Sequence, residues 1–192
     1  MATAIYSTTT QEGVDINTVF ALSTATPEYP APPFLPGELA WGTDGSEWVY
    51  CFSSITIGAG AVVVVSAVPN SWSVALIGGA TVAAASAPVG QLVGIVGGAL
   101  GTMVVPAPSG SVTRNFFWVQ RAGNAPNVAT AASTTKNAQL YSSATVGGIV
   151  SSTAGGAGTT YQINGLVISQ ATGSTAGPNT AILNWPVVGA SA

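Results

Sequence analysis

Charged side chains are scarce in this chain, and histidine is missing altogether. The 192 residues include three basic and six acidic residues and no histidine. A serine triad needs a base, which is usually histidine. Most other chemistry near neutral pH needs positioned acids, bases or metal ligands. The sequence therefore predicts a protein that is not an enzyme, with no catalytic residue, no metal site and no cofactor.

The few charges are also unevenly placed. All six acids lie between Glu12 and Glu47, and all three bases lie between Arg114 and Lys136. A net charge of −3 with only three bases argues against nucleic acid as a partner, because nucleic acid calls for basic patches. A lone soluble domain normally carries about a quarter charged residues. We therefore expect partner chains to cover much of the surface. The charged residues are Glu12, Asp15, Glu28, Glu38, Asp44, Glu47, Arg114, Arg121 and Lys136.

Asp44 and Glu47 form the carboxylate pair that most invites a catalytic or calcium-binding interpretation. Both flank the Asp-Gly tip of an expected hairpin, where Asp suits the geometry of the turn and Glu adds solubility. Calcium would want several more oxygen ligands nearby. An enzyme using Asp44 or Glu47 is therefore the least favoured alternative. The glycine-rich stretch 155–158 is no phosphate loop, because no Lys-Ser/Thr follows it.

Cysteine is limited to Cys51, so an intramolecular disulfide or a C-x-x-C motif is excluded. We interpret Cys51 as a small buried hydrophobic residue. The polar start of the chain, MATAIYSTTTQEG, predicts no secretory signal.

Val89–Val105 is the stretch that most resembles a membrane span, since it is uncharged and spaces Gly90, Gly94 and Gly98 as G-x-x-x-G. It is short for a span, begins just after Pro88 and has no flanking Lys or Arg. Its Val, Ile and Gly content favours short strands separated by turns, so we expect no membrane association.

Valine, threonine, glycine and proline are abundant, with 24 Gly and 12 Pro, which favours strands and turns over helices. Val62–Val65 is typical of a strand buried on both faces. Asn115–Arg121 alternates, with Phe116 and Trp118 on one face and Phe117 on the other. The expected fold class is all-β, an antiparallel β-barrel or sandwich. The expected strands are 38–41, 47–52, 62–65, 72–77, 89–96, 101–105, 115–121, 138–141, 147–150, 161–169 and 181–188, with a turn at 123–127 and a possible short helix at 83–85.

The first 37 residues differ from the rest. Five prolines crowd the stretch 27–36, which favours extended backbone and denies ladder donors. We therefore divide the chain into an extended, proline-rich N-terminal arm (1–37) and a β-rich domain (38–192). The alternative is a disordered tail. The expected apolar anchors of the arm are Tyr6, Phe20, Tyr29 and Phe34.

Each of the five tryptophans lies in a strand-like run, which favours packing in the core or between subunits. The alternative is a carbohydrate-binding or adhesive β module. The tryptophans are Trp41, Trp48, Trp72, Trp118 and Trp185, and the first four are the candidates for stacking on a sugar.

The order of elements from Leu39 to Arg121 resembles the capsid decoration (cement, head-stabilising) proteins of tailed bacteriophages. The matching stretches are GTDGSEWVY at 42–50, ITIGAGAVVV at 55–64, VGQLVG at 89–94 and FWVQRAG at 117–123. The resemblance implies a β-rich, often trimeric subunit without catalytic residues, which binds the major capsid protein on the exterior of an icosahedral head.

The residues themselves also favour assembly over catalysis, since a neutral surface of small side chains packs closely at low entropic cost. We therefore expect a structural virion protein, with other virion parts (fibre, tail or coat subunit) as the nearest alternative. The acidic arm, including Glu12 and Asp15, is expected to pair with the basic region 114–136 of a neighbouring subunit.

Overall fold

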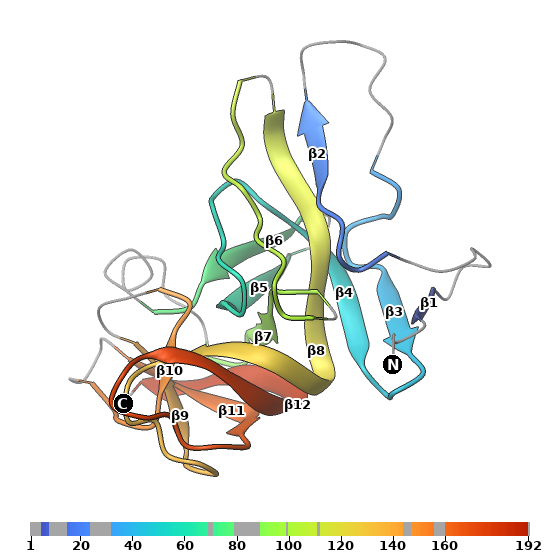
Figure 1. The fold of residues 1–192 in the computed structure, drawn as a ribbon. Helices are drawn as coiled ribbons and strands as arrows, with labels where there is room; N and C mark the ends of the chain where they lie inside the picture. The colour runs from blue at the N-terminus through green and yellow to red at the C-terminus, as the bar shows by residue number, and fades with distance from the viewer. Residues whose placement is uncertain are drawn as a thin grey trace.

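The structure is a computed structural model, and it describes residues 5–7, 15–23, 32–68, 71–78, 89–98, 100–110, 112–143, 147–155 and 160–191. The regular secondary structure in these ranges consists of β-strands, and they join in one 12-stranded sheet (Figure 1). The all-β prediction is confirmed. The predicted short helix at 83–85 lies outside the described residues. The strands are β1 (Ile5–Ser7), β2 (Phe20–Ser23), β3 (Leu39–Gly42), β4 (Glu47–Ser53), β5 (Val62–Val68), β6 (Ser71–Leu76), β7 (Leu92–Ile95), β8 (Val112–Thr130), β9 (Leu140–Ser142), β10 (Val150–Ser151), β11 (Tyr161–Ile168) and β12 (Gly177–Ser191).

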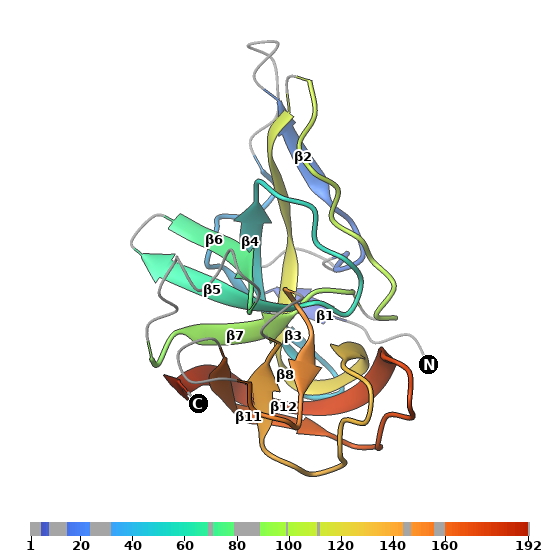
Figure 2. The same ribbon diagram turned by 90° about the vertical axis from the view of Figure 1, so that its left-hand side faces the viewer.

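The strand pairings close two rings that share β8. One ring runs β4–β6–β5–β7–β8, and the other runs β8–β12–β11–β9–β10. Each ring is antiparallel except for one parallel pairing, β4 with β6 and β10 with β8. Figure 1 shows β8 descending past β4 and then curving beside β12, and Figure 2 shows β5–β7 stacked above β11 and β12. The molecule is thus a pair of small barrels joined by one long strand.

The predicted turn at 123–127 is wrong, because β8 continues through it. β8 pairs with β4 up to Ala122 and with β12 from Ala122 to Thr130. Gly123 has a φ of +91°, which glycine adopts without strain. Pro126 lies where the register with β12 shifts, so its missing N–H costs no regular ladder bond. The turn-forming residues therefore bend one strand from the first ring into the second.

The four consecutive valines of β5 form a wall between two hydrophobic cores. Val62 and Val64 belong to one cluster, with residues of β11 and β12, and Val63 and Val65 belong to another, with Phe117 of β8. Successive side chains of a strand point to opposite faces. The predicted burial on both faces is confirmed.

A third cluster covers the outer face of β4 and β8. The predicted alternation of β8 holds here, since Phe116 and Trp118 lie in this cluster while Phe117 lies inside the first ring. Trp48 and Tyr50 of β4 share the cluster with Phe116 and Trp118. These aromatic side chains need a cover, which comes from the N-terminal part of the chain.

The described segments of the predicted arm belong to the same sheet as the domain. β1 pairs with β3, and β2 pairs with the first half of β8. The anchors Phe20 and Phe34 pack on the third cluster. Tyr29 lies outside the described residues. The division at residue 37 therefore stays a prediction, while the described segments act as a cover on the β domain.

The stretch 89–105 contains one short strand, β7, followed by a loop. The predicted strand at 101–105 is wrong, because only Val105 pairs, in an isolated bridge to Ile57. Gly101 has a φ of +66°, which takes the chain out of extended geometry.

Candidate assembly surfaces

Glu47 and Arg121 form an ion pair within the described part of the chain. Glu47 of β4 and Arg121 of β8 lie 3.6 Å apart (Oε1 to Nη1), with 12% and 14% of their side chains exposed. The expectation that Glu47 serves solubility is therefore wrong. β4 and β8 are paired neighbours, and the ion pair joins the first hairpin to the centre of the shared strand.

The described acids Asp44 and Asp15 shape turns. Asp44 Oδ1 accepts a hydrogen bond from the backbone N–H of Ser46 at 3.0 Å, which confirms the predicted role of Asp44 in turn geometry. Asp15 accepts hydrogen bonds from the Thr18 hydroxyl and the Asn17 backbone N–H, and these two bonds lower the pKa of its carboxyl group. Within the described ranges no three Asp, Glu, Cys or His residues lie close enough to hold a metal ion. Asp15 and Asp44 thus serve the local geometry of turns.

The remaining bases are exposed. Arg114 lies 4.5 Å from the ring centroid of Phe52, in a cation–π contact, and Lys136 lies in an exposed turn.

Cys51 is fully buried among Val49, Phe117 and Val119 inside the first ring. Burial raises the pKa of its thiol, and this outweighs the opposite effect of Arg121. The thiolate, the nucleophilic form, is therefore suppressed. The prediction that Cys51 is a buried hydrophobic residue is confirmed.

The third cluster is an aromatic stack closed by Phe34. Its ring centroid lies 5.4 Å from that of Tyr50 and 5.0 Å from that of Trp118, both edge to face. Burial raises the pKa of Tyr50, and its hydroxyl has no hydrogen-bond partner in the described structure. Trp48 and Trp118 are buried here, so they are not available to stack on a sugar.

Two tryptophans remain clearly exposed. Trp41 on β3 is 40% exposed and Trp185 on β12 is 53% exposed, whereas Trp72 is half-buried. Of the four tryptophans that the sequence suggested for sugar binding, Trp41 is thus the most accessible. The exposure of Trp185 is not visible in the sequence, where its run of residues is typical of an ordinary strand.

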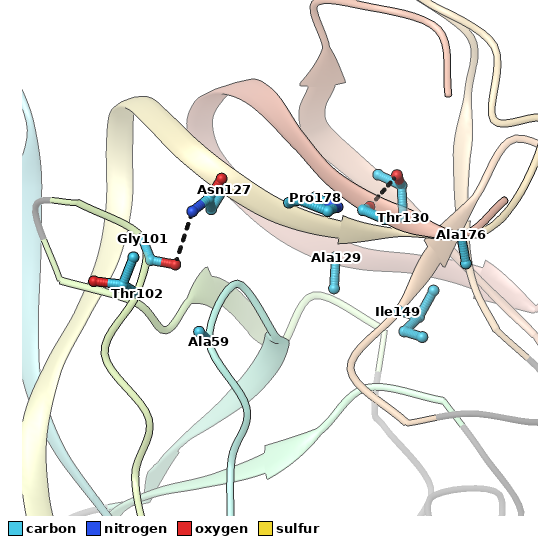
Figure 3. Close-up of a pocket in the computed structure, with 10 residues that line it drawn as sticks. Ala59, Gly101, Thr102, Asn127, Ala129, Thr130, Ile149, Ala176 and Pro178 are labelled. Carbon is cyan, nitrogen blue, oxygen red and sulfur yellow. Dashed lines mark hydrogen bonds between the residues drawn. The ribbon is translucent and has the colours of Figure 1, made fainter. Parts of the chain in front are cut away.

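A cavity of about 510 Å³ lies where a loop of the first ring meets β8 and β12 (Figure 3). Its polar groups are mostly engaged, since Asn127 Nδ2 donates to Gly101 O at 3.1 Å and the Thr130 hydroxyl donates to Gly177 O at 2.8 Å. Small uncharged side chains, such as those of Ala59 and Ala129, form the rest of the wall. The residues that line the cavity include no titratable side chain, so a ligand there would be held mainly by apolar contact and fit.

Large apolar side chains are exposed over several parts of the described surface. A concentration of them lies on the second ring, where exposed Val167 of β11 is the register partner of exposed Ile182 of β12. Single exposed apolar side chains are normal on a protein surface, and only contiguous ones are candidates for a contact surface. The exposed set is Leu35, Trp41, Ile55, Val89, Leu100, Val104, Val167, Ile182 and Trp185.

Comparison with protein-family models, with curated proteins and with solved structures finds no match for this chain. Among the described residues, no helix is long and apolar enough to cross a membrane.

Proposed function

We propose that the protein is a structural subunit of a virion, specifically a decoration or cement subunit on the exterior of an icosahedral bacteriophage head. The observation that carries the proposal is the contrast between ionisable side chains that are engaged within the chain and large apolar side chains that are exposed to solvent. The ionisable groups Glu47, Arg121, Asp44 and Asp15 are engaged in local structure, while large apolar side chains face outward. A surface of this kind supports binding by area and shape rather than catalysis.

In this role the two fused barrels form a stiff unit that spans a junction between major capsid proteins. Ring closure gives the strands of both rings partners on each side, so the described strands with a single partner are β1 and β2. Exposed apolar residues supply contact area with the major capsid protein and with neighbouring copies, a trimer being the favoured arrangement. Neither nucleic acid nor a membrane is a partner in this proposal, and the protein is not an enzyme.

The N-terminal segment has a second use in this proposal. Its described parts cover the aromatic cluster through Phe20 and Phe34, and in this proposal the N-terminal arm (1–37) also anchors the subunit to the shell. Acids of the arm, including Glu12, pair there with the basic region 114–136 of a neighbour.

The test is binding of the purified chain to heads that lack it, read as occupancy by quantitative gel analysis and electron microscopy. We expect saturable binding of the full chain at fixed positions. A chain lacking residues 1–14 should bind more weakly, because it loses part of the arm and keeps Phe20 and Phe34. The absence of saturable binding would reject the decoration role, and undiminished occupancy of the shortened chain would reject the arm as an anchor.

The competing carbohydrate-binding function depends mainly on Trp41, since Trp48 and Trp118 are buried. A glycan-array signal that Trp41→Ala abolishes would favour that function over assembly. We expect no such signal.

A further inference from the structure

β2 (Phe20–Ser23) is paired on one side only. It pairs with β8 and ends the strand order, so its other edge has no partner among the described strands. The ladder between β4 and β8 ends at Asn115, so β2 is the only described strand beside residues 112–114 of β8. Both views show this pair projecting beyond the two rings (Figures 1 and 2). A two-stranded ribbon by itself is marginally stable in water.

The chain just before β2 is packed firmly against the domain. Ile16 is buried in the aromatic cluster, and Val19 packs on the core of the first ring. Asn17 approaches Gly98 so closely that a Cβ on Gly98 would lie 2.5 Å from Asn17 Oδ1. Residues 15–19 therefore form a fixed base from which β2 extends.

The aromatic cluster beneath β2 contains a buried polar atom without a partner. Tyr50 is 2% exposed, and its hydroxyl has no hydrogen-bond partner in the described structure. Phe20 of β2 packs edge to face on Phe116 with 6.4 Å between ring centroids, and Phe116 stacks on Tyr50 at 5.9 Å. A buried hydroxyl without a partner loses the hydrogen bonds that it would make to water. The closed position of β2 therefore carries a cost that opening relieves.

Phe34, which also covers Tyr50, is held more firmly than β2. The Gly37 N–H donates a hydrogen bond to Tyr50 O at 2.7 Å, close to Phe34 in the chain. The indole of Trp72 lies against Gly37 and leaves no room for a side chain there. These contacts tie the turn that carries Phe34 to β4 and β6. Opening is therefore expected at β2, while Phe34 stays in place.

We propose that β2 is a releasable strap. It opens from β8 as a unit on the fixed base 15–19, while both rings stay closed and the Tyr50 hydroxyl gains hydrogen bonds to water. Release bares the apolar side chains of Phe20 and Leu22 together with the aromatic face that they cover. Segments that bind partners are drawn from the parts of a protein that open most easily. Release thus gives the arm (1–37) apolar side chains for anchoring the subunit, a use that rests on the proposed function.

Release of β2 can be measured in the isolated full chain by hydrogen exchange of backbone amides, followed by NMR at increasing denaturant. The amides that join β2 to β8 should exchange at least about a hundredfold faster than those of β5 (Val62–Val68), and almost independently of low denaturant, because they open without the rings. Amides of β2 that exchange as slowly as those of β5 would overturn the inference, since β2 would then open only when the whole chain unfolds.

Tyr50→Phe tests the role of the hydroxyl. The variant keeps the ring and removes the atom without a partner, so the closed state gains stability and the β2 amides should exchange about tenfold more slowly. Tyr161→Phe is the matched control, because Tyr161 packs half-buried on the core of the second ring and should leave the β2 amides unchanged. Slower exchange of β5 with unchanged exchange of β2 in Tyr50→Phe would also overturn the inference.

A disulfide across the strap tests its use in anchoring. Leu22 and Arg114 are register partners, so the double variant Leu22→Cys, Arg114→Cys can be oxidised to hold β2 closed. The oxidised chain should exchange its β2 amides as slowly as those of β5 and bind heads more weakly than the same chain after reduction. Equal binding of the two forms would reject release as part of anchoring. Absence of binding by the wild type would instead reject the proposed function and leave the exchange result standing.

Discussion

The carboxylate of Glu47 and the guanidinium of Arg121 lie 3.6 Å apart on neighbouring strands, and both side chains are largely shielded from water. The pair sits where β8 leaves β4 and begins its ladder with β12, since Ala122 pairs with both strands. It therefore holds the junction of the two rings. Arg121 Nε lacks a further hydrogen-bond partner in the described structure, so Glu47 is its main compensation.

Removing one partner of this pair should destabilise the fold. Glu47→Gln leaves the charge of Arg121 poorly compensated, and we expect a loss of about 2–3 kcal/mol, which is below the roughly 3–5 kcal/mol of fully buried pairs because some solvent reaches both groups. Chemical denaturation measures the loss. The control Lys136→Gln removes an exposed charge and should change stability by less than about 0.5 kcal/mol. Equal losses of stability in the two variants would show that the ion pair stabilises the fold no more than an exposed charge does.

Gly123 should be intolerant of a side chain. Its φ is +91°, and an added Cβ would lie 2.9 Å from the Cα of Ser46. We expect Gly123→Ala to cost at least about 2 kcal/mol, from backbone strain together with the clash. Gly58→Ala is the control, because Gly58 has no positive φ and its added Cβ meets nothing within 4 Å. A thermal midpoint of Gly123→Ala equal to that of the control would show that β8 does not need this bend.

Cys51 should resist thiol reagents while the protein is folded. The side chain is fully buried, and burial raises the pKa of the thiol, so at pH 8 little thiolate forms and reagents cannot reach it. We expect labelling by a chromogenic disulfide reagent only after denaturant is added. The absorbance of the thiolate that the reagent releases measures the labelling. Rapid labelling of the native protein would mean that the first ring opens readily.

Asp15 should contribute to stability in a defined pH range. Hydrogen bonds from Thr18 and Asn17 lower its pKa below the usual 3.8 in the folded state. Its contribution is therefore present above about pH 3.8 and is lost as the pH falls through the lower folded value. Asp15→Ala should be less stable than the wild type at pH 6, and the difference should shrink below pH 3.8. A difference that stays constant down to pH 2 would contradict this role.

Local patterns in the sequence were enough to predict most strands. The valine run of β5 and the alternation of β8 each specify burial directly, because strand periodicity decides which face a side chain takes. The hairpin of β3 and β4 follows from its Asp-Gly tip. The all-β class is thus encoded within short windows of the chain.

Features that depend on distant pairing could not be predicted. Gly123 and Pro126 look like turn residues, and only the ladder to β12 keeps them in a strand. Glu47 looks exposed until β8 brings Arg121 beside it. The exposure of Trp185 follows from a bulge that the register with β11 creates. No local window of sequence contains these partners.

Electron microscopy of the native particle tests the central claim most directly. We expect density for two fused barrels at fixed positions on the exterior of an icosahedral shell, in contact with the major capsid protein. Particles whose outer surface lacks this density, together with recovery of the chain outside the particle, would contradict it.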